Sequence, residues 1–112
     1  MSKTRKWPTF VNYRGQRTKP RAGDILVIHP LSIPDGERQV QFFRRREGGI
    51  ATLSLIEGNA SEDKIGWGDL LNSPHALASV LAAMLGLHIK EEMGLDKITG
   101  CPISSRHFLL CR

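Results

Sequence analysis

The sequence predicts an α+β fold, a small two-layer sandwich in which one long helix packs on an antiparallel sheet of about four to five strands. Several apolar, β-branched runs are separated by turns that contain Gly or Pro. A single long segment after residue 73 instead spaces its apolar residues by three and four. The resulting order, β-β-β-α-β, is typical of a two-layer sandwich. A chain of 112 residues buries about 65% of its unfolded surface, enough for one core.

Four runs are predicted to be strands. The first, residues 24–29, is almost continuously apolar, which indicates a strand covered on both faces. Residues 39–46 and 50–56 flank Glu47-Gly48-Gly49, and two β-rich runs joined by such a turn predict a hairpin. Residues 107–112 are predicted to form a strand that returns to the sheet.

The chain is predicted to divide into a basic N-terminal arm, residues 1–22, and a single α+β domain, residues 23–112. Within the arm, residues 9–13 are compatible with a short edge strand. In the hairpin, alternation places Phe42 and Phe43 on opposite faces. We expect the helix to cover one of these faces and the arm to cover part of the other.

The helix is predicted over residues 74–93. Ser73 is a suitable N-cap, Pro74 suits the first helical position, and Gly94 suits the position after the last turn. Its apolar side includes His88, near the C-terminal end. Because small and apolar residues occupy most of its surface, the helix is expected to be buried in the core or against a second copy. A homodimer through this helix or through the C-terminal strand is therefore a further expectation.

The charge is unevenly distributed. Residues 1–46 hold eleven Lys and Arg residues against three acids, a net charge of +8. Residues 47–112 hold five against eight, a net charge of −3, and the whole chain carries +5. Such an imbalance directs electrostatic attraction toward polyanions or an acidic protein surface.

Aromatic residues lie among the cations of the basic half, and single-stranded nucleic acid binds to such a mixture of cations for phosphates and flat rings for bases. We therefore predict a non-enzymatic protein that contacts single-stranded or structured RNA or DNA through its arm and its Arg-rich hairpin. One helix alone argues against a helix-turn-helix domain. The predicted contact residues are Arg5, Lys6, Trp7, Tyr13, Arg14, Arg17, Lys19, Arg21, Arg44, Arg45 and Arg46.

The alternative function is a small inhibitor or adaptor, of the kind encoded by phages and mobile elements, that docks on a larger protein complex. Salt distinguishes the two predictions. Binding to nucleic acid weakens steeply as the salt concentration rises, whereas a protein interface with an aromatic centre is far less sensitive.

No metal site, cofactor or catalytic residue is predicted. Cys101, His107 and Cys111 have a spacing that brings only the last two close together, whereas a structural zinc site needs four ligands. These cysteines are therefore expected to be buried thiols. An enzyme would need a concave site that holds His29, His88 or His107 beside an arginine or a carboxylate.

A short part of the chain resembles a known family. The segment Pro20-Arg21-Ala22-Gly23-Asp24-Ile25, followed by Gly36-Glu37-Arg38, is similar to the opening of the MazF-type endoribonuclease toxins. The resemblance covers about eighteen residues. It ends at Gln39-Val40-Gln41, where that family continues with a Pro-Val strand. The family begins a β-barrel at this point, and the resemblance implies RNA cleavage as a third function.

The sequence also bears on location. No apolar run approaches the roughly 20 residues of a transmembrane helix, and the opening residues MSKTRKWPTF contain no apolar secretion signal. With two cysteines, a reducing compartment is expected, most simply the cytoplasm, without a membrane partner.

Overall fold

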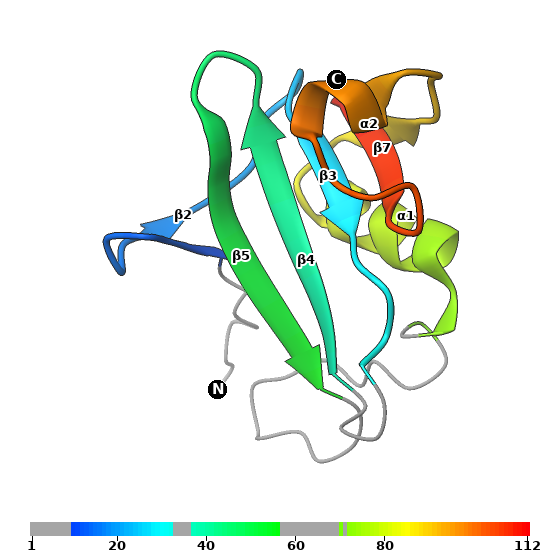
Figure 1. Ribbon diagram of the computed structural model, residues 1–112, viewed down its shortest axis with the longest axis horizontal. Helices are drawn as coiled ribbons and strands as arrows, with labels where there is room; N and C mark the ends of the chain where they lie inside the picture. Colours follow the sequence, from blue (N-terminus) through cyan, green and yellow to red (C-terminus); the bar gives the residue numbers. More distant parts are fainter. Residues whose placement is uncertain (1–9, 33–36, 57–69, 71) are drawn as a thin grey trace.

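The computed structural model describes residues 10–32, 37–56, 70 and 72–112. Within these ranges, seven antiparallel strands form one open sheet in the order β2-β1-β5-β4-β3-β7-β6, and two helices accompany it (Figure 1). The elements are β1 (Phe10–Asn12), β2 (Arg17–Thr18), β3 (Ile25–Ile28), β4 (Glu37–Arg44), β5 (Gly48–Ile56), α1 (Pro74–Met84), β6 (His88–Lys90), α2 (Leu95–Thr99) and β7 (Arg106–Cys111).

The predicted fold class is therefore wrong in its architecture. The sheet has seven strands, not four or five, and two short helices replace the one long helix. The extra strands β1, β2 and β6 are only two or three residues long. β1 lies within residues 9–13, whose sequence is compatible with a short edge strand, and it pairs with β5. The sequence carries no strand signal for β2 and β6, which become strands by pairing with β1 and β7.

The helix predicted over residues 74–93 ends at Met84. Gly86 adopts a φ of +75° there, and the Leu87 N–H donates to the Ala82 carbonyl at 2.9 Å, which closes the helix with a Schellman motif. The chain then extends, and His88 lies exposed in β6 rather than on an apolar helix face. The helical spacing continued past Gly86 in the sequence, but pairing of β6 with β7 decides the conformation.

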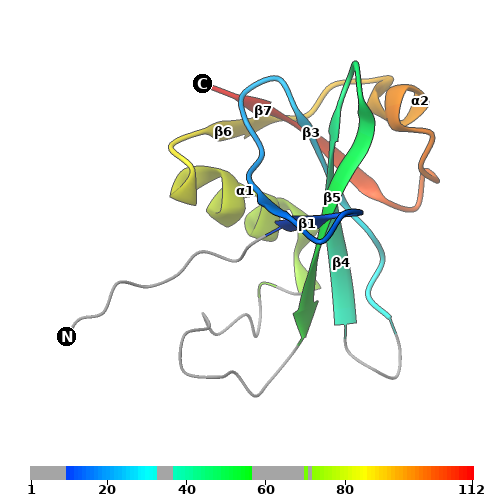
Figure 2. The ribbon, with the colours of Figure 1, turned by 90° about the vertical axis from the view of Figure 1, so that its left-hand side faces the viewer.

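Apolar side chains are buried on both faces of the sheet. Leu26 and Ile28 of β3 face the larger core, which α1 covers, whereas Ile25 and Val27 face a smaller cluster beside α2. In Figure 2, α1 and α2 lie on opposite sides of β3 and β7. The prediction that this strand is covered on both faces is confirmed, since all four residues are buried.

Residues 10–20 of the predicted arm are part of the sheet or packed against it. Phe10 is buried and meets Phe42 edge to face, with ring centroids 5.1 Å apart. It therefore covers the same face as α1, contrary to expectation. Phe43 faces the opposite cluster, which α2 covers through Leu95. The division of the chain at residue 22 stays a prediction.

The predicted β4–β5 hairpin is confirmed, but its tip is shifted. Arg44 pairs with Gly48, so the residues at the tip are Arg45, Arg46 and Glu47 instead of Glu47-Gly48-Gly49. Gly48 adopts a φ of +79°, a conformation that strongly favours glycine. The tip thus presents two arginines and one glutamate together.

The predicted C-terminal strand is confirmed as β7, which pairs with β3 on one side and β6 on the other. On the β6 side the pairing covers only Leu109–Cys111, and the expected homodimer stays a prediction. Among the described helices, none is long and apolar enough to cross a membrane.

Candidate nucleic-acid interface

The turn between β1 and β2 is a compact hydrogen-bonded unit. The Asn12 Oδ1 accepts hydrogen bonds from the backbone N–H groups of Arg14 and Gln16, both at 2.9 Å. The Asn12 side-chain amide donates in turn to the Gln16 Oε1 at 3.2 Å, and Gly15 adopts a φ of +79°. These contacts fix the backbone of Tyr13 and Arg14 at the end of the hairpin.

Tyr13 is the exposed aromatic ring of this turn, with 85% of its surface accessible. The guanidinium carbon of Arg14 lies 5.5 Å from the ring centroid, within cation–π distance. The guanidinium covers one face of the ring, and the other face is open. An open aromatic face beside a cation is the arrangement on which an unpaired base stacks while its phosphate meets the charge.

A groove of about 360 Å³ separates this turn from the β4–β5 tip. Its volume lies within the range of about 300–1,000 Å³ that is usual for small-molecule sites. Side chains from both hairpins line it: Asn12, Tyr13, Arg14, Gln16, Thr18, Arg44, Glu47, Gly49 and Ile50. The structure thus brings together three residues predicted to contact nucleic acid, Tyr13, Arg14 and Arg44.

Three exposed arginines are neighbours in sequence of residues that line the groove. Arg17 is exposed between the lining residues Gln16 and Thr18. Arg45 and Arg46 are exposed between the lining residues Arg44 and Glu47. These three arginines are exposed neighbours in sequence of groove residues and are not themselves part of its lining.

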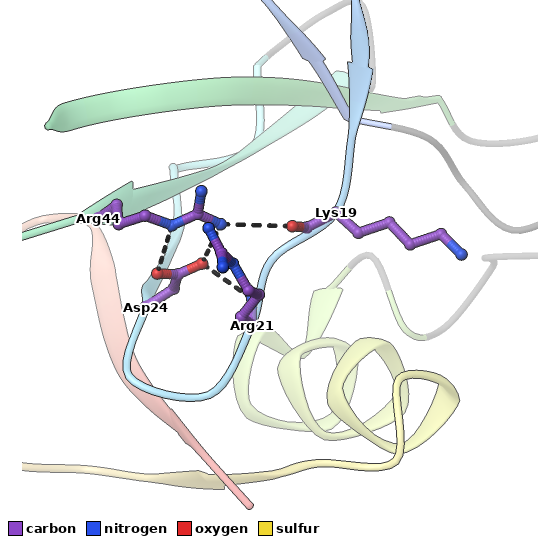
Figure 3. Close-up of polar contacts among 4 residues, drawn as sticks. All are labelled: Lys19, Arg21, Asp24 and Arg44. Atoms are coloured by element: carbon purple, nitrogen blue, oxygen red, sulfur yellow. Dashed lines mark hydrogen bonds and ion pairs between the residues drawn. The ribbon is translucent and has the colours of Figure 1, made fainter.

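Arg44 itself is held in an ion pair. Its Nε and Nη2 donate to the two carboxylate oxygens of Asp24 at 3.0 and 2.9 Å, and its Nη2 lies 3.5 Å from the Lys19 carbonyl (Figure 3). The Arg21 backbone N–H donates to the same carboxylate at 2.8 Å. Asp24 is 3% exposed, so this cluster ties the end of β4 to the segment that leads into β3.

This cluster changes the role of Arg44. Hydrogen bonding to Asp24 raises the pKa of the Arg44 guanidinium above its ordinary value, so the ion pair persists throughout the physiological range. Its charge is matched by a buried carboxylate, and it forms part of the groove wall. Among the arginines of this hairpin, Arg45 and Arg46 have the exposure that phosphate contact requires.

The other predicted residues lie as follows. Lys19 and Arg21 are exposed in the segment between β2 and β3, and the Lys19 side chain points away from the Asp24 cluster (Figure 3). Arg5, Lys6 and Trp7 lie outside the described residues.

Sequence reasoning missed four polar groove residues, Asn12, Gln16, Thr18 and Glu47. The separation of Asn12 and Gln16 by four residues around a glycine is a local turn signal that identifies the first two. No local signal brings Glu47 to Thr18, because the pairing of β1 with β5 places the two hairpins side by side.

A half-buried polar chain links β5, β4, the residue after β3 and the segment before β7. The Gln41 amide nitrogen lies 3.4 Å from the Thr52 Oγ1, and its Oε1 lies 2.6 Å from the His29 Nε2. The His29 Nε2 therefore carries the proton, and its Nδ1 accepts from the Ser105 hydroxyl at 3.0 Å. Ser105 is 3% exposed. Through its contact with His29, the buried Ser105 hydroxyl links the segment before β7 to the sheet, and it is not accessible to a substrate.

His107 is the histidine that borders a second hollow, of about 280 Å³, near α2. Its Nε2 lies 2.8 Å from the Thr99 Oγ1, and burial lowers its pKa. The neighbouring Arg106 pairs with Glu91 at 3.4 Å. Arg106, Glu92 and Asp96 line the same hollow, so it places a histidine beside an arginine and carboxylates.

Cys101 and Cys111 are free thiols, both half-buried. In the described part of the chain, no three His, Cys, Asp or Glu side chains gather as metal ligands.

Of the residues that resemble the MazF-type opening, residues 20–25 lead into β3, Glu37 and Arg38 begin β4, and Gly36 lies outside the described residues. Asp24 is the buried partner of Arg44. Arg38 is 7% exposed, burial lowers its pKa, and its Nε has no hydrogen-bond partner within the described ranges. RNA cleavage stays a prediction from the resemblance.

Comparison of the chain with protein-family models, with curated proteins and with solved structures finds no match.

Proposed function

We propose that the protein is a small, non-enzymatic nucleic-acid-binding protein. The contact surface is the groove between the β1–β2 turn and the β4–β5 tip, with its flanking arginines. The ligand is a single strand or an unpaired segment of a structured RNA or DNA.

One observation carries the proposal: Tyr13 is 85% exposed beside Arg14, at the mouth of a groove of about 360 Å³. A ring this exposed at a polar groove adds little to a hydrophobic core, and it supplies the flat surface that a base needs. Arg17, Arg45 and Arg46, which are exposed and adjacent in sequence to groove residues, are the cations available for phosphate contacts.

The groove also favours unpaired over paired nucleic acid. A base reaches an aromatic face only when it is out of the duplex stack. Among the described helices there is no helix-turn-helix pair that would place a recognition helix in the major groove. The helix α1 instead packs on the sheet through Leu77 and Leu81.

The test is fluorescence anisotropy with labelled single-stranded RNA, single-stranded DNA and duplex, each at two salt concentrations. We expect tighter binding to the single strands and a steep decrease of affinity with salt. The double variant Arg45→Ser/Arg46→Ser should bind more weakly, and its salt slope should fall by about 0.7 for each phosphate that these arginines neutralise in the wild type.

The matched control is Lys90→Ser/Lys97→Ser, which removes the same charge from exposed positions in β6 and α2. It should retain most of the affinity. Equal decreases in the two double variants would mean that net charge, rather than this surface, drives binding. Absence of binding at low salt would refute the proposal.

A second candidate function, docking on a larger protein complex, is favoured by exposed apolar residues around α2. Met93 is 99% exposed, Ile103 85% and Ile98 49%, and the first two border the 280 Å³ hollow. Exposed apolar side chains grouped in this way are typical of protein interfaces. The same titrations discriminate, because a partner held by this surface would stay bound at salt concentrations that release nucleic acid.

A further inference from the structure

We propose that Glu47 gives the groove a base preference: it selects an unpaired base that carries an exocyclic amino group, guanine above all, over uracil or thymine. This inference rests on the proposed nucleic-acid function and adds the chemical identity of the ligand. Glu47 is here a specificity-determining residue.

The position of Glu47 is the first step. Its backbone N–H donates to the Arg44 carbonyl at 2.8 Å, which fixes it at the β4–β5 tip. It lines the groove opposite Tyr13 and Gln16. Among the described residues, it forms no ion pair within 4.0 Å, although the neighbouring residues at the tip are arginines.

A carboxylate at this place needs an explanation. It repels the phosphates that the surrounding arginines attract, so it weakens binding to any polyanion as such. A carboxylate accepts hydrogen bonds and donates none. Within the protein its charge attracts Arg44. A ligand adds to this only through hydrogen-bond donors, which a nucleic acid carries on its bases and, in RNA, on the 2′-hydroxyl that every nucleotide shares. Only the donors of the bases can make Glu47 discriminate between bases.

Bases differ in the donors that they offer. Uracil and thymine present one ring N–H between two carbonyl acceptors, whereas cytosine and adenine carry an amino group that a carboxylate accepts. Guanine places its amino group next to a ring N–H, so both oxygens of one carboxylate are satisfied. A base stacked on Tyr13 would turn this edge toward Glu47.

The facing wall supports the same assignment. The Gln16 Oε1 already accepts from the Asn12 amide at 3.2 Å, which leaves the Gln16 amide N–H groups as donors. The groove thus combines an acceptor from one hairpin with donors from the other. Every base offers both kinds of group on its pairing edge, but guanine alone places an amino group directly beside a ring N–H for the carboxylate.

The experiment compares two short RNA oligomers by anisotropy at low salt: an oligouridylate, and the same oligomer with a single central guanosine. The wild type should bind the guanosine oligomer at least about fivefold more tightly. In Glu47→Ala this ratio should fall to near one, while the affinity for oligouridylate stays the same or rises because a negative charge is removed. Glu47→Gln should have an intermediate ratio.

Glu92→Ala is the matched control, since it removes the same charge from an exposed position outside the groove. It should keep the wild-type ratio. A wild-type ratio near one with measurable binding, or a ratio that persists in Glu47→Ala, would overturn this inference and leave the proposed function standing. If neither oligomer binds, the proposed function fails, and the inference fails with it.

Discussion

Asp24 is the most constrained acidic residue that the structure describes. Three N–H groups donate to its carboxylate, two from Arg44 and one from the Arg21 backbone. Its side chain is only 4% exposed, and that of Arg44 20%. A carboxylate so deeply buried is tolerable because its charge is matched and its lone pairs are occupied.

Replacement of Asp24 by Asn should therefore destabilise the protein severely. The change leaves the Arg44 guanidinium half-buried without a counter-charge, and we expect the free energy of unfolding to fall by about 3 kcal/mol, the lower end of the range for breaking a buried ion pair. Urea denaturation followed by circular dichroism measures it. In Asp24→Asn/Arg44→Met both partners are gone, and the destabilisation should be smaller than the sum of the single changes. A decrease below about 0.5 kcal/mol in Asp24→Asn would contradict the assignment, since that is the size of an ordinary surface substitution.

Residue types were predictable at this scale, but their partners were not. The run of arginines at 44–46 identifies a basic surface from the sequence alone. Which arginine is committed to the fold depends on Asp24, twenty residues earlier, and on the register that brings β3 beside β4. Glu47 was overlooked for the same reason, because its neighbours in the groove come from β1 and β2.

Secondary-structure elements were predictable where the local pattern was sufficient. The strand near residue 26 and the β4–β5 hairpin are confirmed because their apolar runs and turn residues act locally. The extent of α1 was not predictable, because both Gly86 and Gly94 are sterically suited to end a helix and the intervening residues fit either conformation. The pairing of β6 with β7, a tertiary contact, decides between the two.

Strand β7 should be indispensable. It lies between β3 and β6, and its Phe108 and Leu110 are at most 1% exposed. Removal of residues 106–112 would uncover both neighbouring strands and delete two core side chains, worth several kcal/mol together. We expect the shortened chain to lack the cooperative thermal transition of the full chain in circular dichroism. The control, removal of the exposed Arg112 alone, should preserve it. A cooperative transition in the shorter chain would mean that β3 is stable with only one partner.

The whole molecule carries its positive charge on particular elements. Cations of the two hairpins and of the segment that joins β2 to β3 account for most of the excess in residues 1–46. Of the acids in the second half that the structure describes, Glu91 and Glu92 directly follow β6, whereas Glu47 lines the groove. Charge asymmetry was readable from the sequence, but the meeting of Arg14 with Arg44 at one groove follows from the sheet order.

Salt should stabilise the free protein. Exposed like charges on the two hairpins repel one another, and moderate ionic strength screens this repulsion more than it weakens the buried Asp24–Arg44 pair. Between low and physiological salt we expect a gain of about 0.5 kcal/mol, comparable with a few exposed charge interactions. Thermal unfolding at the two salt concentrations measures it, with Arg45→Ser/Arg46→Ser expected to gain less. A decrease of stability with salt would mean that attractive surface pairs outweigh the repulsion.

The sheet order also has a kinetic consequence. β3 is central, yet its partner β7 lies about eighty residues further along the chain. The β4–β5 hairpin closes through neighbouring residues, on a scale of about 1–10 μs for a hairpin, whereas the β3–β7 ladder waits for a long loop to close. Such non-local pairing slows folding. Until it is complete, the edge of Ile25-Leu26-Val27-Ile28 that β7 later occupies has no partner, which makes this strand the segment most exposed to aggregation while the chain folds.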